Sequence, residues 1–408
     1  MGGLEEVERW VDRNRDRIVD TVASLVRIRT ENLPPGGNEK PGQEHLRELA
    51  AGFTAKEDLD MFEVDDVPGI REHPLFFPTI EGRERLYKDR PILTARRRGM
   101  GGGRSLVYSG HMDTMPSYSK GWTVFEDPFS GRVKDGRLYG RGAIDMKAGT
   151  AAGFLALQCL HDLGVELAGD VWAESVVDEE YGGANGTLAA RLRNPDIDFA
   201  LLGEPSDLAV GVETFGGTDW KASVVEKGAG GIGVGQTGVN PIHSLARVAL
   251  ALDAYDRHLS RMAPPPAYPR EMRARLLTYQ IASGGSTYAE SGAVPTSGHL
   301  YFWQETFAGR GEAEARAELL DFVRRELDAG GPMAGEAPEI HPVIRFLEGH
   351  RTDRRHPGLV SVRRAYEAAG IPHAERGLPF ASDAFIFRKA SKTDVAVVGP
   401  VGGNPHGI

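Results

Sequence analysis

The stretch SLVYSGHMD, residues 105–113, decides more about the fold than any other part of the sequence. Its first six residues form an apolar run of the length expected for a buried strand, and His111 and Asp113 follow where that strand would end. A lone histidine and aspartate at a strand-to-loop corner are usually solvated. The pair therefore indicates a functional site only if the rest of the chain supplies partners.

Short apolar runs alternate with helical segments on the C-terminal side of this stretch and again near the end of the chain. Further strands are predicted at 170–177, 198–203 and 393–400, and helices at 146–164, 185–192 and 382–390. Strands that alternate with helices predict an α/β fold, with a mostly parallel sheet and helices on both of its faces.

The basic stretch RRRGMGGGR, residues 96–104, lies between two apolar runs, PILTA and SLVYSG. This position predicts a hairpin turn between two strands. The stretch lacks the Lys-Ser/Thr ending of a P-loop, so no phosphate-binding loop is predicted here.

The middle of the chain follows a different order. Strands are predicted at 216–228, 274–285, 297–307 and 338–347, and helices at 240–259 and 312–327. The order β-α-β-β-α-β is that of a ferredoxin-like α+β unit. We therefore predict one α/β domain, residues 1–211 and 349–408, interrupted by a smaller α+β domain, residues 212–348.

Composition and charge exclude several classes of function. The 408 residues are 40% hydrophobic and 26% charged, which is typical of a soluble globular protein without a membrane span. The N-terminus lacks the basic-then-apolar order of a signal peptide, so a cytoplasmic location is expected. A net charge of −10 argues against nucleic acid as a partner. Because Cys159 is the only cysteine, a metal ion would have to be held by His, Asp and Glu.

Histidines and acidic residues recur at the ends of the predicted strands of the α/β domain. They are His111, Asp113, Glu179, Glu180, Glu204 and His406, and Asp145 directly precedes the helix at 146–164. Ligands bind at the carboxyl ends of the strands in open α/β sheets, so these side chains are expected to meet at one edge. Their oxygen and nitrogen donors suit two hard or borderline metal ions, zinc above all.

Five segments carry a more specific signal. They are SGHMDTMP (109–116), GRGAIDMKAG (140–149), DEEYGG (178–183), GEPSD (203–207) and GPVGGNPHG (399–407). In this order the sequence resembles the dinuclear zinc aminoacylase and exopeptidase family, which includes acetylornithine deacetylase, succinyl-diaminopimelate desuccinylase and glutamate carboxypeptidase. The resemblance implies that the α/β domain is a metal-binding catalytic domain and that the smaller domain is a lid and dimerisation domain.

The resemblance also implies a role for each site residue. Asp145 would bridge two metal ions, with His111 and Glu204 completing one site. Glu180 and His406 would complete the other. Asp113 would accept the second ring N–H of His111 and fix its tautomer. Glu179 would be the general base.

These roles predict a reaction. Two zinc ions per chain, or cobalt or manganese in their place, would share a water and lower its pKa, and Glu179 would take its proton. The expected activity is hydrolysis of an amide in a small N-acyl amine, N-acyl amino acid or dipeptide-like substrate. The smaller domain is expected to form a homodimer.

Two departures from the family pattern fall in the smaller domain. Counting back from GVNPI (238–242) places Gly231 where relatives carry a histidine that supports the oxyanion. Where many relatives carry an arginine that binds a substrate carboxylate, this sequence has Gln304 and Glu305. A neutral or cationic substrate group would suit Glu305 better than a carboxylate would. The predicted substrate contacts are Gln304, Glu305, Arg310 and Asn240.

Two other interpretations stay open. A dipeptidase or carboxypeptidase-type exopeptidase would use the same metal residues with a different pocket. A degenerate homologue would bind a ligand or metal without turnover; Gly231 favours this interpretation, and the presence of Glu179 opposes it. The sequence stops two residues after His406, where relatives usually continue, so a missing tail is a further expectation.

Overall fold

The structure, a computed structural model, forms two compact units. It describes residues 2–117, 122–225, 240–284, 295–330, 338–404 and 406. The first unit consists of Met1–Glu213, Arg351–Arg376 and Ser382–Ile408, and the second of Thr214–His350 and Gly377–Ala381. The main boundaries, 213/214 and 350/351, lie beside the predicted 211/212 and 348/349. The sequence did not indicate that residues 377–381 belong to the second unit.

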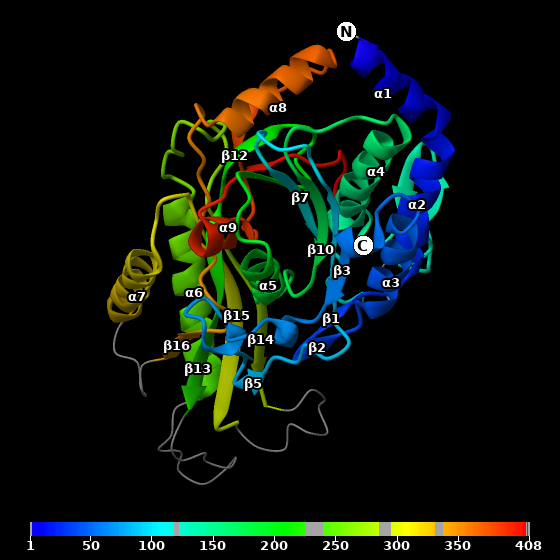
Figure 1. Ribbon diagram of the computed structural model, residues 1–408. Helices are drawn as coiled ribbons and strands as arrows, with labels where there is room; N and C mark the ends of the chain where they lie inside the picture. The colour runs from blue at the N-terminus through cyan, green and yellow to red at the C-terminus, as the bar shows by residue number, and fades with distance from the viewer. Residues whose placement is uncertain are drawn as a thin grey trace, which may run out of the picture. The chain divides into compact units, whose positions relative to one another are not determined.

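An eight-stranded sheet is the framework of the first unit (Figure 1), with its strands in the order β17-β12-β18-β11-β7-β10-β6-β3. The four central strands run parallel: β18 (Asp394–Val397), β11 (Phe199–Leu202), β7 (Leu106–His111) and β10 (Val171–Val176). The outer strands are β6 (Ile92–Arg97), β3 (Leu59–Phe62), β12 (Val210–Thr214) and β17 (Glu375–Leu378); the last residue of β12 and the last two of β17 belong to the second unit. β6 and β12 are antiparallel to their central neighbours. The predicted mostly parallel α/β sheet is confirmed.

The hairpin predicted at residues 96–104 is wrong. β10 lies between β6 and β7, so the glycine-rich segment crosses the N-terminal end of β10 instead of turning between paired strands. The backbone N–H groups of Met100, Gly101 and Gly103 donate to the carbonyls of Leu167 and Ala168 at 2.8–3.1 Å. A Cβ on Gly103 would lie 2.4 Å from the nitrogen of Gly169, so the close approach of the two backbones requires glycine.

Helices cover both faces of this sheet. α2 (Arg15–Arg27), α3 (Lys40–Ala50) and α4 (Ala148–Asp162) bury one hydrophobic cluster against β6 and β10, which includes Ala173. α5 (Asn185–Arg193) lies on the opposite face, because its Arg191 pairs with Glu174, and adjacent strand residues point to opposite faces. α9 (Ala384–Ser391) packs beside α5, and α8 (Pro357–Ala368) packs on β11, β12 and β18.

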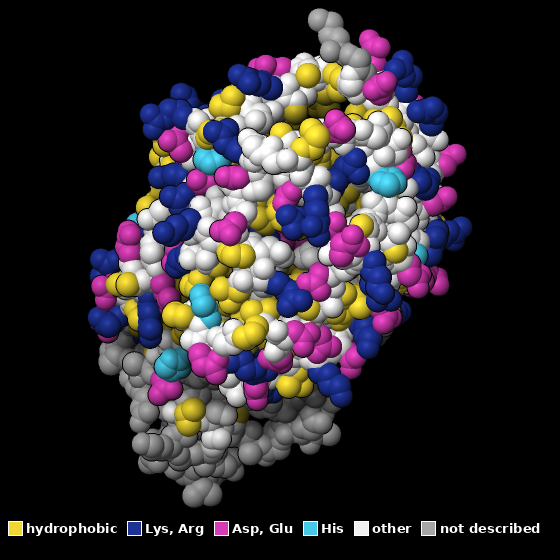
Figure 2. Space-filling model, in the orientation of Figure 1, with side chains coloured by type: hydrophobic (Ala, Val, Ile, Leu, Met, Phe, Trp, Pro, Cys, Tyr) yellow, Lys and Arg dark blue, Asp and Glu magenta, His cyan; other side chains and the backbone are white. Residues whose placement is uncertain are grey.

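The surface of the described residues mixes charges of both signs. Figure 2 shows basic and acidic side chains interspersed on the visible face. Exposed ion pairs occur among the described residues, such as Lys40 with Asp89 at 2.6 Å and Arg71 with Asp65 at 2.6 Å. Within the described part of the chain, no helix has both the length and the apolar character needed to cross a bilayer.

The second unit is a four-stranded antiparallel sheet that packs against two helices. Along the chain it reads β13 (Gly216–Val225), α6 (Pro241–Leu259), β14 (Leu276–Ser283), β15 (Ser297–Thr306), α7 (Glu312–Ala329) and β16 (Glu339–Pro342). The strands lie in the order β14-β15-β13-β16. Trp220, Ala222 and Val224 are buried with the inner faces of α6 and α7, while the residues between them are partly exposed. The predicted ferredoxin-like order is confirmed.

A buried amide crosses the core of the second unit. The indole Nε1–H of Trp220 donates to Oε1 of Gln304 at 2.9 Å, and both side chains are buried. The amide nitrogen of Gln304 lies 3.4 Å from the hydroxyl of Tyr255 and 3.3 Å from the carbonyl of Ala315. Gln304 therefore joins β15 to β13, α6 and α7.

Replacing Gln304 should destabilise the second unit. Gln304→Met keeps the volume but leaves the indole N–H of Trp220 buried without an acceptor, which should cost about 1–3 kcal/mol of unfolding free energy. Urea denaturation followed by tryptophan fluorescence measures the change. Gln280→Met, on an exposed site of β14, is the matched control. Equal stability of the two variants would contradict the structural role of Gln304.

Candidate metal centre

Six of the predicted site residues meet at the carboxyl ends of the central strands. Asp145 precedes α4, and the others are at the end of β7 or in the loops that follow β10, β11 and β18. The six are His111, Asp145, Glu179, Glu180, Glu204 and His406. Parallel strands deliver these side chains to one place because their carboxyl ends share one edge of the sheet.

The carboxylate of Asp145 lies between the two histidines. Its Oδ1 is 3.1 Å from Nε2 of His111, and its Oδ2 is 3.2 Å from Nε2 of His406. Glu180 Oε2 lies 3.0 Å from the same nitrogen of His406. Glu204 Oε1 lies 3.6 Å from Nε2 of His111. Each oxygen of Asp145 thus lies beside a different imidazole, and each imidazole has a glutamate near it.

Glu179 lies at the edge of this arrangement. Its Oε2 is 3.8 Å from Nε2 of His111, which places it on the side of Asp145 that also holds Glu204. The ligand atoms of His111, Glu179 and Glu204 lie within 4.8 Å of one another, as do those of His111, Asp145 and Glu180. The centre has donor atoms for two ions placed side by side.

The centre concentrates negative charge on carboxylates that are at most 14% exposed, whereas the side chain of His406 is 53% exposed. Burial, followed by the charges of neighbouring carboxylates, raises the pKa of Glu179 and of Glu204 well above the usual range, although His111 lowers both. Burial disfavours the charged form of His111, but the neighbouring carboxylates, Glu204 first, raise its pKa well above the usual value. When ionised, the four carboxylates outnumber the two imidazoles, so the side chains of the centre balance their charge only by taking up protons. Two divalent cations would balance it, and carboxylate and imidazole donors fit zinc, cobalt or manganese.

Asp113 contacts His111 differently from the prediction. Nδ1 of His111 lies 2.8 Å from the backbone carbonyl of Asp113, whereas the carboxylate Oδ1 is 3.7 Å away. The carboxylate instead accepts from Nδ2 of Asn32 at 2.9 Å and from the backbone N–H of Glu180 at 3.1 Å. The ring tautomer is therefore fixed by the main chain of Asp113, and its side chain orients the Glu180 loop.

Two contacts of the centre were missed in the sequence. The guanidinium of Arg141 donates to the backbone carbonyl of His406 at 3.1 Å, and Asn32 bonds Asp113 as described above. Arg141 stands in the motif GRGAID, so its proximity to Asp145 was a usable signal. Asn32 is 81 residues from Asp113 and lies in no motif, so no local pattern indicated this contact.

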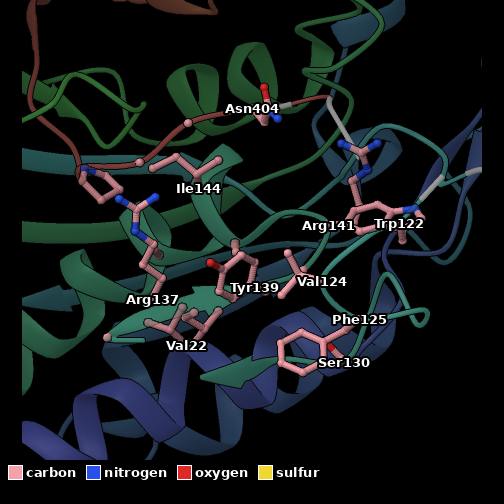
Figure 3. A pocket seen from close by; sticks show the side chains of 18 of the residues that line it. Val22, Trp122, Val124, Phe125, Ser130, Arg137, Tyr139, Arg141, Ile144 and Asn404 are labelled. Carbon is pink, nitrogen blue, oxygen red and sulfur yellow. The ribbon is translucent and has the colours of Figure 1, made fainter. Parts of the chain in front are cut away.

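A cavity of about 860 Å³ lies beside the centre in the first unit (Figure 3). Asn404 and Ile144 lie on one side of it, and Val22 and Phe125 on the other. None of the six clustered residues is among the described residues that line it, so the cavity is not the metal centre. Arg141 belongs to both, because it lines the cavity and also bonds His406.

The four predicted substrate contacts each have partners within the second unit. The role expected of Gln304 does not fit its surroundings, because its amide is buried and bonded within the core. Asn240 caps α6 by accepting the N–H of Ile242 at 3.0 Å. Arg310 pairs with Glu314 and Glu318. Burial raises the pKa of Glu305 to about 7, and this carboxylate accepts the backbone N–H of Arg275 at 2.8 Å. Gly231 lies outside the described residues.

Comparison with known proteins gives three kinds of similarity. The model of the peptidase family M20/M25/M40 matches residues 107–408. An N-formyl-4-amino-5-aminomethyl-2-methylpyrimidine deformylase of Bacillus subtilis is 26% identical over 390 residues, which cover 89% of this chain and 82% of that protein. A succinyl-diaminopimelate desuccinylase of Methylobacterium radiotolerans is 36% identical over 179 residues, or 41% of this chain and 44% of that protein. The solved structure of a dipeptidase from Saccharomyces cerevisiae matches with a TM-score of 0.72 at 11% identity, and the match covers 99% of this chain and 93% of the dipeptidase chain. At this identity the similarity concerns the fold alone.

Proposed function

Because the chain belongs to the peptidase family M20/M25/M40, we propose that it is a metal-dependent amidohydrolase that removes an acyl group from an amine. The observation that carries this proposal is the carboxylate of Asp145, which lies between two imidazoles with Glu179 beside one of them. The names of the similar proteins, a deformylase and a desuccinylase, support an acyl-amine substrate. Membership in this family agrees with the resemblance found in the sequence motifs.

We propose zinc as the metal, with two ions per chain. Asp145 would bridge them, His111 and Glu204 would hold one, and Glu180 and His406 the other. When bound, such ions polarise a carbonyl and lower the pKa of a water. The chemistry of the donor set supports zinc, and cobalt and manganese bind the same kinds of donor.

Glu179 is the proposed general base. It lies beside His111 on the Glu204 side of Asp145, and the proposed ligand roles go to Asp145, Glu180 and Glu204 instead. Its backbone carbonyl accepts the N–H of Gly182 at 2.7 Å, which fixes the turn from which the side chain projects. From this position the carboxylate takes a proton from the attacking water and gives it to the leaving amine.

Removing the base should separate turnover from metal binding. Glu179→Ala should lower kcat by about 10²–10⁴-fold, the usual contribution of general acid–base catalysis, while the protein retains two ions per chain. Amine release and inductively coupled plasma mass spectrometry measure the two quantities on the same sample. His406→Ala is the contrasting variant, because it should lose an ion as well as activity. A Glu179→Ala enzyme with near wild-type kcat would assign the base to another residue.

A panel of substrates tests the reaction itself. Purified protein loaded with zinc or cobalt should release free amine from at least one class among N-formyl, N-acetyl and N-succinyl amines and dipeptides, with Glu179→Ala as the blank. Release from dipeptides alone would favour the exopeptidase alternative. No release from protein that holds two ions would favour a homologue that only binds its ligand.

The substrate is expected to carry a neutral or cationic group where many N-acyl amino acids carry a carboxylate. Glu305, a half-buried carboxylate, stands where the resemblance implies an arginine that would bind a substrate carboxylate. An N-acyl amino acid amide should therefore have a higher kcat/KM than the corresponding free acid. The opposite preference would contradict this assignment of the substrate group.

We also propose a homodimer formed through the second unit. β14 is an edge strand of its sheet, and it carries the exposed apolar side chains Leu277, Tyr279 and Ile281, which are 61%, 52% and 55% exposed. An edge strand with exposed apolar side chains favours pairing with a second copy. Light scattering at micromolar concentration should give twice the mass of one chain. Tyr279→Lys combined with Ile281→Lys should give monomers, whereas Val133→Lys, at an exposed site of the first unit, should not.

A further inference from the structure

We propose that Arg85 and Tyr87 are positioning residues for the loop that carries Glu179 and Glu180, and that they act by fixing Asp178. The inference rests on the proposed function of that loop. Both residues precede the segment, 107–408, that matches the family model. The metal centre would then depend on a part of the chain that lies outside the family motifs.

Both oxygens of the Asp178 carboxylate are held from the same segment. Nη1 of Arg85 donates to Oδ1 at 2.6 Å, and the hydroxyl of Tyr87 donates to Oδ2 at 2.6 Å. The side chains of Arg85 and Asp178 are 2% and 0% exposed. Burial raises the pKa of Tyr87 well above its usual value, so its hydroxyl remains a donor. Asp178 thus has one fixed orientation.

Arg85 also holds the far side of the loop. Its Nη2 donates to the backbone carbonyl of Tyr181 at 2.8 Å. The guanidinium therefore bonds one residue before Glu179 and one residue after Glu180. A rigid planar fork can make both bonds at once, and an ammonium group at the same place cannot reproduce that geometry.

The loop is too tightly packed around Asp178 to accommodate another arrangement easily. Asp178 has a positive φ of 66°, and its carbonyl accepts the N–H of Ala184 at 2.9 Å. A Cβ on Gly183 would lie 1.8 Å from Oδ2 of Asp178 and 2.7 Å from Nη1 of Arg85. The chain thus passes directly over the ion pair, which leaves no room for a side chain.

A second layer holds Tyr87 and balances the charge. Nδ2 of Asn185 donates to the hydroxyl of Tyr87 at 2.5 Å. Arg90 forms a buried ion pair with Glu39 at 2.6 Å, and its Nη1 lies 3.9 Å from Oδ1 of Asp178. Two arginines therefore face two carboxylates. Loss of Arg85 would leave a buried negative charge next to Glu179, which is far more costly than the loss of a complete pair.

Contacts on the opposite side link this network to the metal centre. The backbone N–H of Glu180 donates to Asp113 at 3.1 Å, and Oε1 of Glu180 accepts the N–H of Met115 at 2.9 Å. The loop is thus held between Asp178 on one side and the segment after β7 on the other. If Asp178 shifts, Glu179 and Glu180 shift together. The expected defect affects kcat and the ion on the Glu180 side, with little effect on KM.

The alternative is that the ion pair only stabilises the fold. The ion pair of Arg191 with Glu174 is the matched control, because it is equally buried. It also joins the two elements on either side of the same loop, β10 before it and α5 after it. Among the described residues, no hydrogen bond or ion pair that involves Arg191 or Glu174 reaches Asp178 or Glu180. Arg191→Met should therefore lower stability without changing metal binding.

The test compares Arg85→Met, Arg85→Lys, Tyr87→Phe and Arg191→Met with the wild-type protein. Competition with a chromogenic chelator measures zinc affinity, and mass spectrometry counts the retained ions. Steady-state kinetics give kcat and KM, and thermal unfolding gives Tm. Arg85→Met should bind one of its two ions more weakly, by no more than the roughly 10–100-fold that follows loss of a direct partner of a metal ligand, because Arg85 acts on Glu180 only through Asp178 and Tyr181. Arg85→Lys should recover part of that loss. Tyr87→Phe should lower kcat about tenfold, with KM within about twofold of wild type, given the typical contribution of one hydrogen bond to a charged group.

The inference would be overturned if Arg85→Met and Tyr87→Phe kept the zinc affinity and the kcat of the wild-type protein and differed from it only in a lower Tm. The same pattern of metal loss in Arg191→Met would overturn it as well, because general destabilisation would then explain the effect. If Arg85→Met does not fold, the zinc affinity and kcat of Tyr87→Phe test the inference, because this variant removes only a single hydroxyl. A wild-type protein that neither binds two ions nor releases amine would overturn the proposed function and this inference with it.

Discussion

The collection of carboxylates at one buried edge of the sheet is the constraint on which the rest of the first unit depends. Asp145, Glu179, Glu180 and Glu204 lie around two imidazoles, and burial raises the pKa of each of the three glutamates. Such a cluster opposes folding unless cations or protons neutralise it. The parallel strands bring these side chains together, and the resulting charge explains why the centre fits two divalent ions.

The structure around the centre holds these charged side chains through main-chain contacts and outer ion pairs. The carbonyl of Asp113 fixes His111, and the carbonyl of His406 accepts from Arg141. Glu180 is bonded at its backbone N–H and at its carboxylate. Side chains that are already held in one rotamer lose less conformational entropy when an ion binds. The same restriction keeps the proposed base apart from the proposed ligands.

Much of the fold was predictable, because periodicity and motif order are local properties. The strand at 105–110 and the helix at 240–259 correspond to β7 and α6. The errors concern partners distant in sequence. The hairpin at 96–104 failed because strand neighbours depend on which strand inserts between them, here β10. Gln304 was expected to contact substrate, but its direction is set by the pleat of β15, which turns the amide toward Trp220 in the core.

The sequence by itself determined the family, the α/β and ferredoxin-like plan, and the set of residues that gather at the strand ends. These features depend on residue type and spacing, which the chain carries along its length. The tertiary structure alone decided how those residues are held. Arg85 and Asp178 are 93 residues apart, and Asn32 and Asp113 are 81 apart, so no local pattern pairs them. Such pairs form because a buried charge or amide must find a partner, and only the folded chain determines which partner is within reach.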